Sequence, residues 1–400
     1  FSNKLRRVQL NHGNDFERES LSTGVGTSSV VGGIPKDSLL PYRSTLFYKA
    51  EKETDLRVTY TDTLGCGGEE TGRTGNVGCK FEVLINNKEC VEPGALIMSI
   101  KRKATSTYVA EVRRQHTMVG VCRRLNGDTD PMDPKSYELT VRVSQPSSFN
   151  YGVPYAGGGA TLLTAEEIPP SSSDSSVERL GFGWTKTITI GDNRKNNNLQ
   201  NRRFWFTPLA SMSSKDNGET WLDFLWSDNF RCSGGNSGAS CAWEVLIQNK
   251  VCADPGPIRF DMTNAHNSED YEHHTLIGSC RRLKGDVAIE TGKAYLLTIK
   301  EKAVKDFSPG HGSPYIGIDG TSGYMELRQR WESTAVTSLR NTLVVPAPKA
   351  SDTTPSSGDS TSLGELSTRT LSFESTSENQ ESLFIFWYDS FACKGGPNVG

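Results

Sequence analysis

The sequence lacks any hydrophobic run that approaches the roughly 20 residues a membrane-spanning helix requires, so we expect no membrane span. It also lacks an excess of positive charge: 44 Lys and Arg stand against 47 Asp and Glu, for a formal net charge of −3. A nucleic-acid-binding surface that depends on overall positive charge is therefore excluded. No Asn-x-Ser/Thr site occurs, so we expect no Asn-linked sugar, whereas the Ser/Thr/Pro-rich stretches are candidates for O-linked sugar.

The length and composition indicate a folded protein with more than one domain. The chain has 400 residues, which predicts two or three domains. Its 7 Trp, 12 Tyr and 16 Phe supply enough large apolar side chains for packed cores. The chain begins at Phe1 rather than Met, which favours a mature or trimmed product.

Nine cysteines fall into two groups of four and one left over. The groups are Cys66, Cys79, Cys90 and Cys122, then Cys232, Cys241, Cys252 and Cys280, and the last is Cys393. No Cys-x-x-Cys pair is present, which argues against a structural zinc site and favours two disulfides in each group. The pairing within a group stays open, because four cysteines allow three pairings. Since disulfides persist in oxidising compartments, we expect an extracellular or cell-surface protein.

An internal repeat organises the chain. Residues 79–94, CKFEVLINNKECVEPG, recur as CAWEVLIQNKVCADPG at 241–256, and HTMVGVCRRL at 116–125 recurs as HTLIGSCRRL at 274–283. Ordered identities of this density indicate a duplication. We therefore predict one repeat over 1–170, a Ser/Pro-rich linker over 171–176 and a second repeat over 177–332.

A third copy begins near the end of the sequence. Residues 222–235, LDFLWSDNFRCSGG, are echoed by LFIFWYDSFACKGG at 383–396, so residues 333–400 are interpreted as the start of an incomplete third repeat. Cys393 then lacks a partner because that cysteine would lie after residue 400. The interpretation predicts that the sequence is part of a longer array.

Period-2 alternation of β-branched and polar residues dominates the sequence. Residues 139–143, 187–190 and 296–299 have this strand pattern, and 82–85 and 244–247 are short apolar runs that end as at a tight turn. Only 161–168 also fits two turns of helix, although its counterpart at 323–331 is better described as a strand. Many short strands with Gly-rich turns predict an all-β fold of tandem disulfide-bonded β-sandwich repeats, jelly-roll-like in type.

The order of the repeated motifs resembles a known family. Cys79 to Pro93 followed by His116 to Cys122, and the same pattern from Cys241 to Cys280, resemble the C-terminal globular domain of the collagen triple helix repeat-containing protein family. The resemblance implies a secreted, disulfide-bonded β-sandwich of the complement C1q type, used for assembly or ligand binding. This chain has no Gly-x-y collagen run and carries the domain in tandem.

Candidate chemical sites are few. Asp128, Asp130 and Asp133 lie in one short loop and are a weak candidate for calcium, although a solvated acidic turn is the favoured interpretation. The repeated histidines His116 and His274 are interpreted as hydrogen-bonded structural residues rather than metal ligands. The repeated pairs Arg123-Arg124 and Arg281-Arg282 are expected to bind carboxylates on neighbouring strands, with acidic glycans as the alternative.

We expect no metal, no cofactor and no enzymatic activity, because no catalytic set of residues is evident and no pair of carboxylates recurs as a glycosidase would need. The leading hypothesis is an extracellular structural protein that self-assembles with copies of itself into a fibre or surface appendage. An exposed sheet edge could accept a strand donated by a neighbouring chain. The expected donor residues are Lys4, Leu5, Arg6, Arg7, Val8, Gln9 and Leu10. The alternative is a secreted adhesion or binding module that recognises a glycan or protein.

Overall fold

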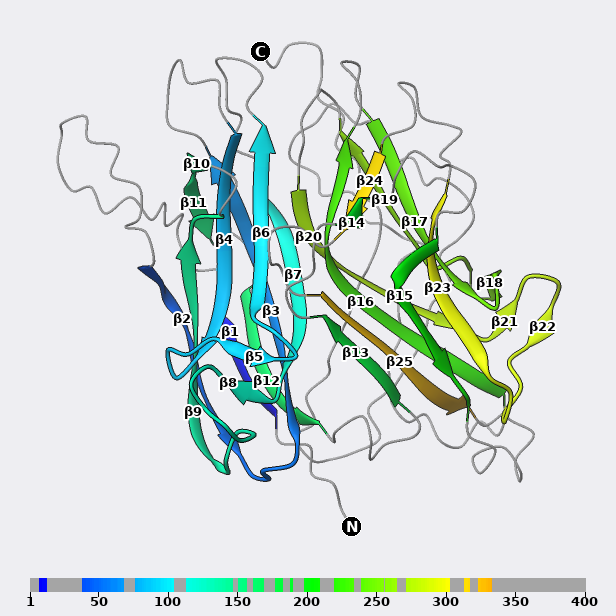
Figure 1. The fold of residues 1–400 in the computed structure, drawn as a ribbon, viewed down its shortest axis with the longest axis horizontal. Helices are drawn as coiled ribbons and strands as arrows, with labels where there is room; N and C mark the ends of the chain where they lie inside the picture. The colour runs from blue at the N-terminus through cyan, green and yellow to red at the C-terminus, as the bar shows by residue number, and fades with distance from the viewer. Residues whose placement is uncertain are drawn as a thin grey trace, which may run out of the picture.

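The protein is all-β, and two layered units lie side by side in the computed structural model (Figure 1). The described residues are 7–12, 38–67, 76–103, 113–146, 150–156, 161–168, 177–182, 188–189, 198–208, 219–233, 239–254, 256–264, 271–302, 313–316 and 323–332. No helix in this part of the chain is long and apolar enough to cross a membrane.

The N-terminal unit contains the first twelve strands. They are β1 (Arg7–His12), β2 (Ser38–Lys49), β3 (Asp55–Gly67), β4 (Asn76–Ile85), β5 (Cys90–Glu92), β6 (Leu96–Lys103), β7 (Arg113–Cys122), β8 (Arg124–Leu125), β9 (Lys135–Ser144), β10 (Asn150–Tyr151), β11 (Val153–Ala156) and β12 (Thr161–Ile168). One layer has the order β1-β12-β3, with β7 and β11 also paired to β3, and the other has the order β2-β9-β4-β6.

The C-terminal unit contains the remaining strands. They are β13 (Val177–Phe182), β14 (Ile188–Thr189), β15 (Asn198–Phe206), β16 (Glu219–Ser233), β17 (Ala239–Ile247), β18 (Lys250–Asp254), β19 (Arg259–Asn264), β20 (Tyr271–Cys280), β21 (Arg282–Leu283), β22 (Val287–Ala288), β23 (Tyr295–Lys302), β24 (Ser313–Ile316) and β25 (Gly323–Glu332). One layer has the order β13-β25-β16-β20, and the other pairs β15, β23, β17 and β19.

Equivalent strands pair in the same register in both units. Leu56 of β3 lies opposite Cys122 of β7, and Leu222 of β16 lies opposite Cys280 of β20. Likewise β4 pairs with β6 and β9 as β17 pairs with β19 and β23. The unit boundaries expected from the sequence stay predictions, because the linker at 171–176 and residues 333–400, including Cys393, lie outside the described residues.

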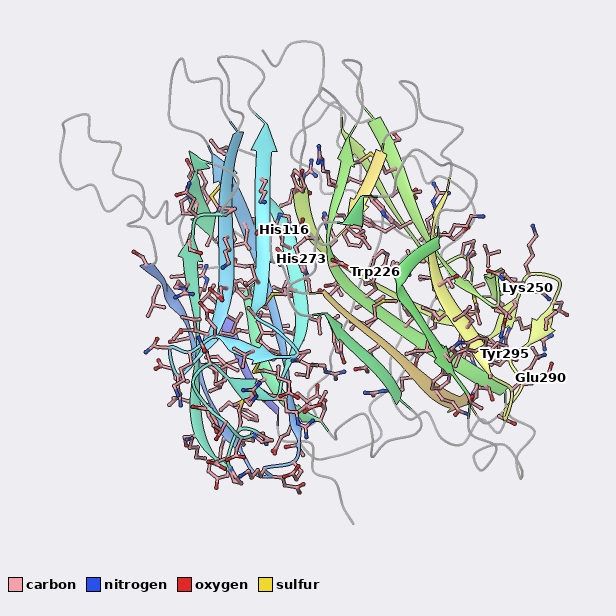
Figure 2. The ribbon with its side chains drawn as sticks, in the orientation of Figure 1. His116, Trp226, Lys250, His273, Glu290 and Tyr295 are labelled. Atoms are coloured by element: carbon pink, nitrogen blue, oxygen red, sulfur yellow. A yellow bond between two sulfur atoms is a disulfide. The ribbon has the colours of Figure 1, made fainter. Side chains whose placement is uncertain are left out.

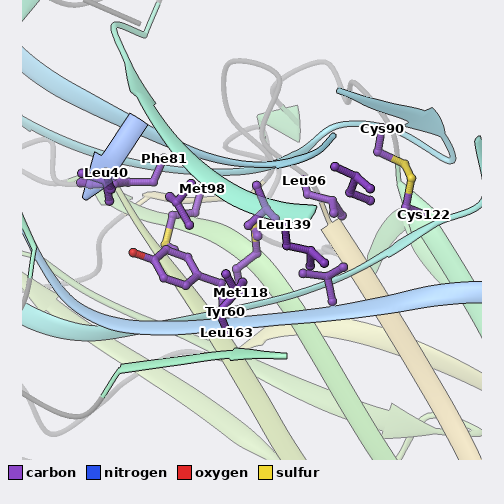
Figure 3. Packing of buried hydrophobic residues seen from close by; sticks show 14 of the residues in the cluster. Leu40, Tyr60, Phe81, Cys90, Leu96, Met98, Met118, Cys122, Leu139 and Leu163 are labelled. Atoms are coloured by element: carbon purple, nitrogen blue, oxygen red, sulfur yellow. A yellow bond between two sulfur atoms is a disulfide. The ribbon is translucent and has the colours of Figure 1, made fainter. Parts of the chain in front are cut away.

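Each unit has its own hydrophobic core between its layers. In β9, apolar residues recur at every second position, and these residues, Tyr137, Leu139, Val141 and Val143, are buried in the core. This is the period-2 pattern of a strand with one buried face. Figure 3 shows how side chains from both layers of the N-terminal unit, among them Tyr60, Phe81, Met98, Leu139 and Leu163, pack together.

The C-terminal core is richer in aromatic rings. Phe230 lies at its centre, with ring centroids 4.7 Å from Trp226, 5.0 Å from Trp243 and 4.7 Å from Phe260. Such tilted and edge-to-face arrangements are the favourable ones for aromatic pairs.

Four disulfides resolve the pairing that the sequence left open. Cys66–Cys79 joins β3 to β4, and Cys232–Cys241 joins β16 to β17, so each of these bridges ties together the two layers of its unit. Cys90–Cys122 and Cys252–Cys280 tie the next hairpin of each unit to β7 and β20. The bridges fit the oxidising, extracellular environment expected from the sequence.

Three expectations on strands need correction or completion. Residues 7–10 of the expected donor segment pair within their own chain, since β1 runs antiparallel to β12 with Arg7 opposite Glu166. Lys4, Leu5 and Arg6 lie outside the described residues. In the C-terminal unit the place of β1 is taken by β13, which runs antiparallel to β25, while of the expected strand at 187–190 the structure describes Ile188–Thr189 as β14. Residues 161–168, for which a helix was the alternative, form β12, because pairing with β3 satisfies their backbone groups.

Candidate functional site

The most elaborate polar arrangement in the described structure lies where the two units meet. We call this contact the seam: it is formed by β6 and β7 of the N-terminal unit and β16, β20 and β25 of the C-terminal unit. His116 of β7 and His273 of β20 lie side by side there (Figure 2). Because β7 and β20 are equivalent strands, the repeated His116 and His274 also meet, with ring centroids 5.6 Å apart.

Backbone groups of one unit bond directly to the other across the seam. Tyr271 of β20 pairs with Lys101 of β6, which joins layers of the two units into one 11-stranded sheet. The Val119 amide donates to Ser227 Oγ at 2.9 Å, and Thr275 Oγ1 donates to the Thr117 carbonyl at 2.6 Å.

Asn229 Nδ2 donates to the Ser99 carbonyl at 2.8 Å, and both side chains are buried. With the bonds from Val119 and Thr275, this contact involves two strands of the C-terminal unit, β16 and β20, and both layers of the N-terminal unit. Each buried backbone group that bonds across the seam would be left without a partner if the units separated.

Charged groups are also held in the seam. Glu272 is buried, and its carboxylate accepts bonds from Arg114 Nη1 at 2.8 and 2.9 Å and from His274 Nε2 at 3.2 Å. Burial alone would raise the pKa of Glu272, but the bond from His274 and the charge of Arg114 outweigh it and hold the pKa well below its usual range. The carboxylate therefore stays ionised inside the protein.

Two histidines of the seam are kept neutral. His116 Nδ1 donates to the His273 carbonyl at 3.0 Å, and burial lowers the pKa of His116 to about 4. Burial, together with the nearby His274 and His116, holds the pKa of His273 well below its usual value. Protonating either ring would place a charge in a desolvated contact.

Ser227 and His273 form a serine–histidine pair, with Oγ 2.9 Å from Nε2. Such a pair is the beginning of a nucleophile arrangement, but a nucleophile must also be reachable and its base must be oriented by a third group. Both side chains are fully buried, and His273 Nδ1 makes no hydrogen bond within the described part of the chain. In this conformation the pair is part of the contact between the units.

Two further contacts close the seam at its ends. At one end the Tyr271 ring lies between two cations, 5.4 Å from Lys101 Nζ and 4.6 Å from Arg231 Cζ. Burial, with a smaller effect of Arg231, lowers the pKa of Lys101 to about 7.

At the other end of the seam, Arg57 forms ion pairs with Glu166 of its own unit and with Glu326 of the other unit. An apolar cluster fills the space between the polar contacts: Val119, Val121, Ile168, Tyr324 and Leu225.

The calcium candidates are not brought together. Asp128 Oδ1 lies 2.6 Å from Lys88 Nζ, Asp133 is 3.4 Å from Lys52 Nζ, and Asp130 bonds only weakly to Thr129 at 3.5 Å. Among the described residues, no group of three or more His, Cys, Asp or Glu side chains could hold a metal ion. Asp128 and Asp133 belong to separate surface ion pairs.

The repeated arginine pairs bind carboxylates of neighbouring strands. Arg124 lies 3.1 Å from Glu92, and Arg281 pairs with Asp254, the residue equivalent to Glu92. Arg282 pairs with Asp286 at 3.0 Å. Arg281 corresponds to Arg123, which lies 3.8 Å from Glu92, so this ion pair recurs between equivalent residues of the two units.

Sequence reasoning missed most of the seam. His116 and His274 were noticed because they repeat, but Ser227, Glu272 and Asn229 carry no repeated signal. Their positions in the first unit are occupied by Thr61, Arg114 and Thr63, as the strand registers show. A search for positions at which the two repeats differ, rather than positions at which they are identical, would have found these three residues.

Comparison with protein families finds no matching model, and comparison with curated proteins finds no match. Among solved structures, the chain is similar to a peptide-N(4)-(N-acetyl-β-D-glucosaminyl) asparagine amidase at 8% identity, covering 81% of this chain and 96% of that chain with a TM-score of 0.29. PNGase F, a glycosylasparaginase from Flavobacterium meningosepticum, matches at 7% identity over 82% of this chain and 100% of that chain, with a TM-score of 0.26. The ANXUR2 extracellular domain from Arabidopsis thaliana matches at 8% identity over 72% and 81%, with a TM-score of 0.17.

The expectation of no enzymatic activity is corrected by this comparison, because two of the similar structures are enzymes. Their TM-scores are so low that the likeness carries no argument for an amidase activity in this chain. The resemblance to the collagen triple helix repeat-containing family stays a prediction, since no family model matches.

Proposed function

We propose that this chain is an extracellular structural protein that associates by joining sheet edges and self-assembles with further copies into a fibre or surface appendage. The observation that carries the proposal is the pairing of β20 with β6, where the edge of one unit continues the sheet of the other. A sheet edge presents unpaired N–H and C=O groups, so it is a ready site for further pairing. The proposal also includes the tandem, jelly-roll-like repeats that the sequence predicts.

The character of the seam supports a structural role. A binding module on a flexible hinge needs little contact between its units, whereas a structural element must fix their relative position. Here Arg57, Arg114 and Asn229 of different strands all bond across the contact, and an apolar cluster fills its middle. Donation of residues 4–10 to a neighbouring chain is not retained, because β1 is paired within its own chain.

Sedimentation velocity over a concentration series, with negative-stain electron microscopy of the same samples, tests the proposal. We expect species larger than one chain whose share grows with concentration, and filaments with a regular axial repeat. A single species with the mass of one chain at every concentration, and isolated particles on the grid, would contradict it. In that case a screen of glycan and protein ligands would follow, since the binding module is the alternative.

A further inference from the structure

We propose that the outer edge of β2 is the contact through which a second copy of this chain pairs, strand against strand, with Leu46 at the centre. The inference deepens the proposed function and rests on it. The 11-stranded sheet ends at β2, on the side of the N-terminal unit away from the seam (Figure 1). Beyond β9, no other strand of the described chain pairs with it.

The exposed side chains of β2 are neutral and largely apolar. Leu46 is 69% exposed, Tyr48 is 50% exposed, and the exposed residue on the same face before them is Ser44. These residues lie in the regular part of the strand, where Ser44 to Lys49 pair residue by residue with β9. The register with β9 shifts between Leu39 and Ser44, so the regular edge segment is Ser44–Lys49. A regular and apolar edge segment is the kind that pairs with another chain.

The two charged side chains in the described part of β2 point away from solvent. Arg43 is buried and donates from Nε to Asp62 Oδ2 at 2.8 Å, and Lys49 is buried with Nζ 3.0 Å from the Lys52 carbonyl. Inward charges can protect an edge by becoming desolvated when a strand is added. Here both are already buried and bonded, so an added strand imposes little further desolvation.

Two other strands of the same fold, β6 and β19, allow a comparison, within the described part of the chain, between an edge that contacts another unit and an edge that does not. On β6, where Lys101 pairs with Tyr271 of β20, the side chains of Ile97, Ser99 and Lys101 are all buried. On β19, the strand equivalent to β6, the same positions carry Arg259 and Asp261, which form an ion pair at the surface. In this comparison the exposed side chains in the described part of β2 lack the surface charges that β19 carries.

A second copy is the occupant that fits the edge. Two β2 strands related by a two-fold axis would run antiparallel and set Leu46 and Tyr48 of one copy against the same residues of the other. No like charges would meet, because the exposed residues of this segment are uncharged. The pairing would extend the 11-stranded sheet in the way that β20 already extends it at β6.

The test is sedimentation equilibrium of the full chain and of Leu46→Lys, with Trp205→Lys as the matched control. Trp205 occupies the equivalent position of β15: it is 61% exposed and precedes Phe206, which lies opposite Tyr295 as Phe47 lies opposite Tyr137. We expect Leu46→Lys to weaken the first association step at least about tenfold and Trp205→Lys to leave it unchanged. Tyr48→Lys is a second variant and should weaken the step in the same direction.

Each result separates the inference from the proposed function. If the wild-type chain associates and Leu46→Lys associates equally well, the β2 contact is wrong while self-assembly stands. If both Leu46→Lys and Trp205→Lys weaken association equally, the specific role of β2 is also wrong. If the wild-type chain stays a single species throughout, both proposals fail. Unchanged melting temperatures of the lysine variants exclude misfolding as the cause.

Discussion

The Nδ1 atom of His116 donates a hydrogen bond to the backbone carbonyl of His273, 3.0 Å away and across the contact between the two units. The bond joins strands that occupy equivalent positions in the two units. It also fixes the His116 ring in a place where a positive charge is strongly disfavoured. The first prediction depends on that environment.

Acidification should destabilise the protein through His116. Its pKa is lowered to about 4 in the folded state and is about 6.5 when unfolded, so the stability it supplies is present above pH 6.5 and is lost as the pH falls toward 4. We expect a loss of about 3 kcal/mol over this range, with His273 adding in the same direction. Urea unfolding at several pH values measures it. His116→Gln should flatten the dependence, and an unchanged slope in that variant would show that another group is responsible.

Asp62→Asn should be strongly destabilising. The buried carboxylate of Asp62 accepts bonds from Arg43 Nε at 2.8 Å, Tyr60 Oη at 3.0 Å and Thr161 Oγ1 at 3.0 Å. Removing its charge breaks the buried ion pair with Arg43, which costs about 3–5 kcal/mol. Thermal unfolding of Asp62→Asn and of the control Asp133→Asn, on an exposed ion pair, measures the difference. A loss of similar size in both variants would mean that burial is not the cause.

Gly278→Ala should destabilise more than Gly120→Ala, although the two glycines are equivalent. A Cβ on Gly278 would lie 2.8 Å from two atoms of the β-branched Ile258 side chain, which has few ways to move aside. On Gly120 the clash is with Leu96 Cδ2, the mobile end of its side chain. We expect a cost of about 1–3 kcal/mol for Gly278→Ala.

Melting temperatures of the two alanine variants measure the glycine effect, and Gly256→Ala is the control because a Cβ there meets nothing within 4 Å. Gly278→Ala should cost less in an Ile258→Ala background, because that change removes Cγ1 and Cγ2, the two atoms that the added methyl group would clash with. A control variant that melts as early as Gly278→Ala would contradict the steric explanation.

The two disulfides of the N-terminal unit should differ in their contribution to stability. Cys90–Cys122 closes 32 residues of chain and Cys66–Cys79 closes 13. In the chain-entropy description, replacing both cysteines by alanine costs about 4 kcal/mol for the longer loop and about 3 kcal/mol for the shorter. Denaturant unfolding of the two paired variants gives the comparison. The reverse order would mean that native-state contacts rather than loop closure decide the effect.

Much of the local structure was predictable because it depends on short-range patterns. The alternation around Leu139 and Val141 predicted a strand, and the end of the apolar run before Asn86 predicted a tight turn, where Asn86 and Asn87 adopt positive φ. Asn tolerates that conformation better than most residues, so the turn has a local cause. The grouping of eight cysteines within the repeats likewise predicted four bridges.

The chain positions of β1 and β13 were not predictable in the same way. The alternation at 187–190 predicted a strand there, yet Val177–Phe182 is the segment that pairs with β25, as β1 pairs with β12. Short apolar strands are alike in composition, so their register is decided by the strand that they meet.

By itself the sequence determined the all-β character, the duplication and the presence of paired cysteines, because strand alternation, repeated motifs and cysteine grouping are all written along the chain. Only the tertiary structure decided which cysteines pair, that Ser227, Glu272 and Asn229 face the other unit, and that Leu46 stays exposed while Arg43 is buried. These properties depend on residues that are distant in sequence meeting in space. A pattern along one strand specifies which side chains share a face, but not what that face will touch.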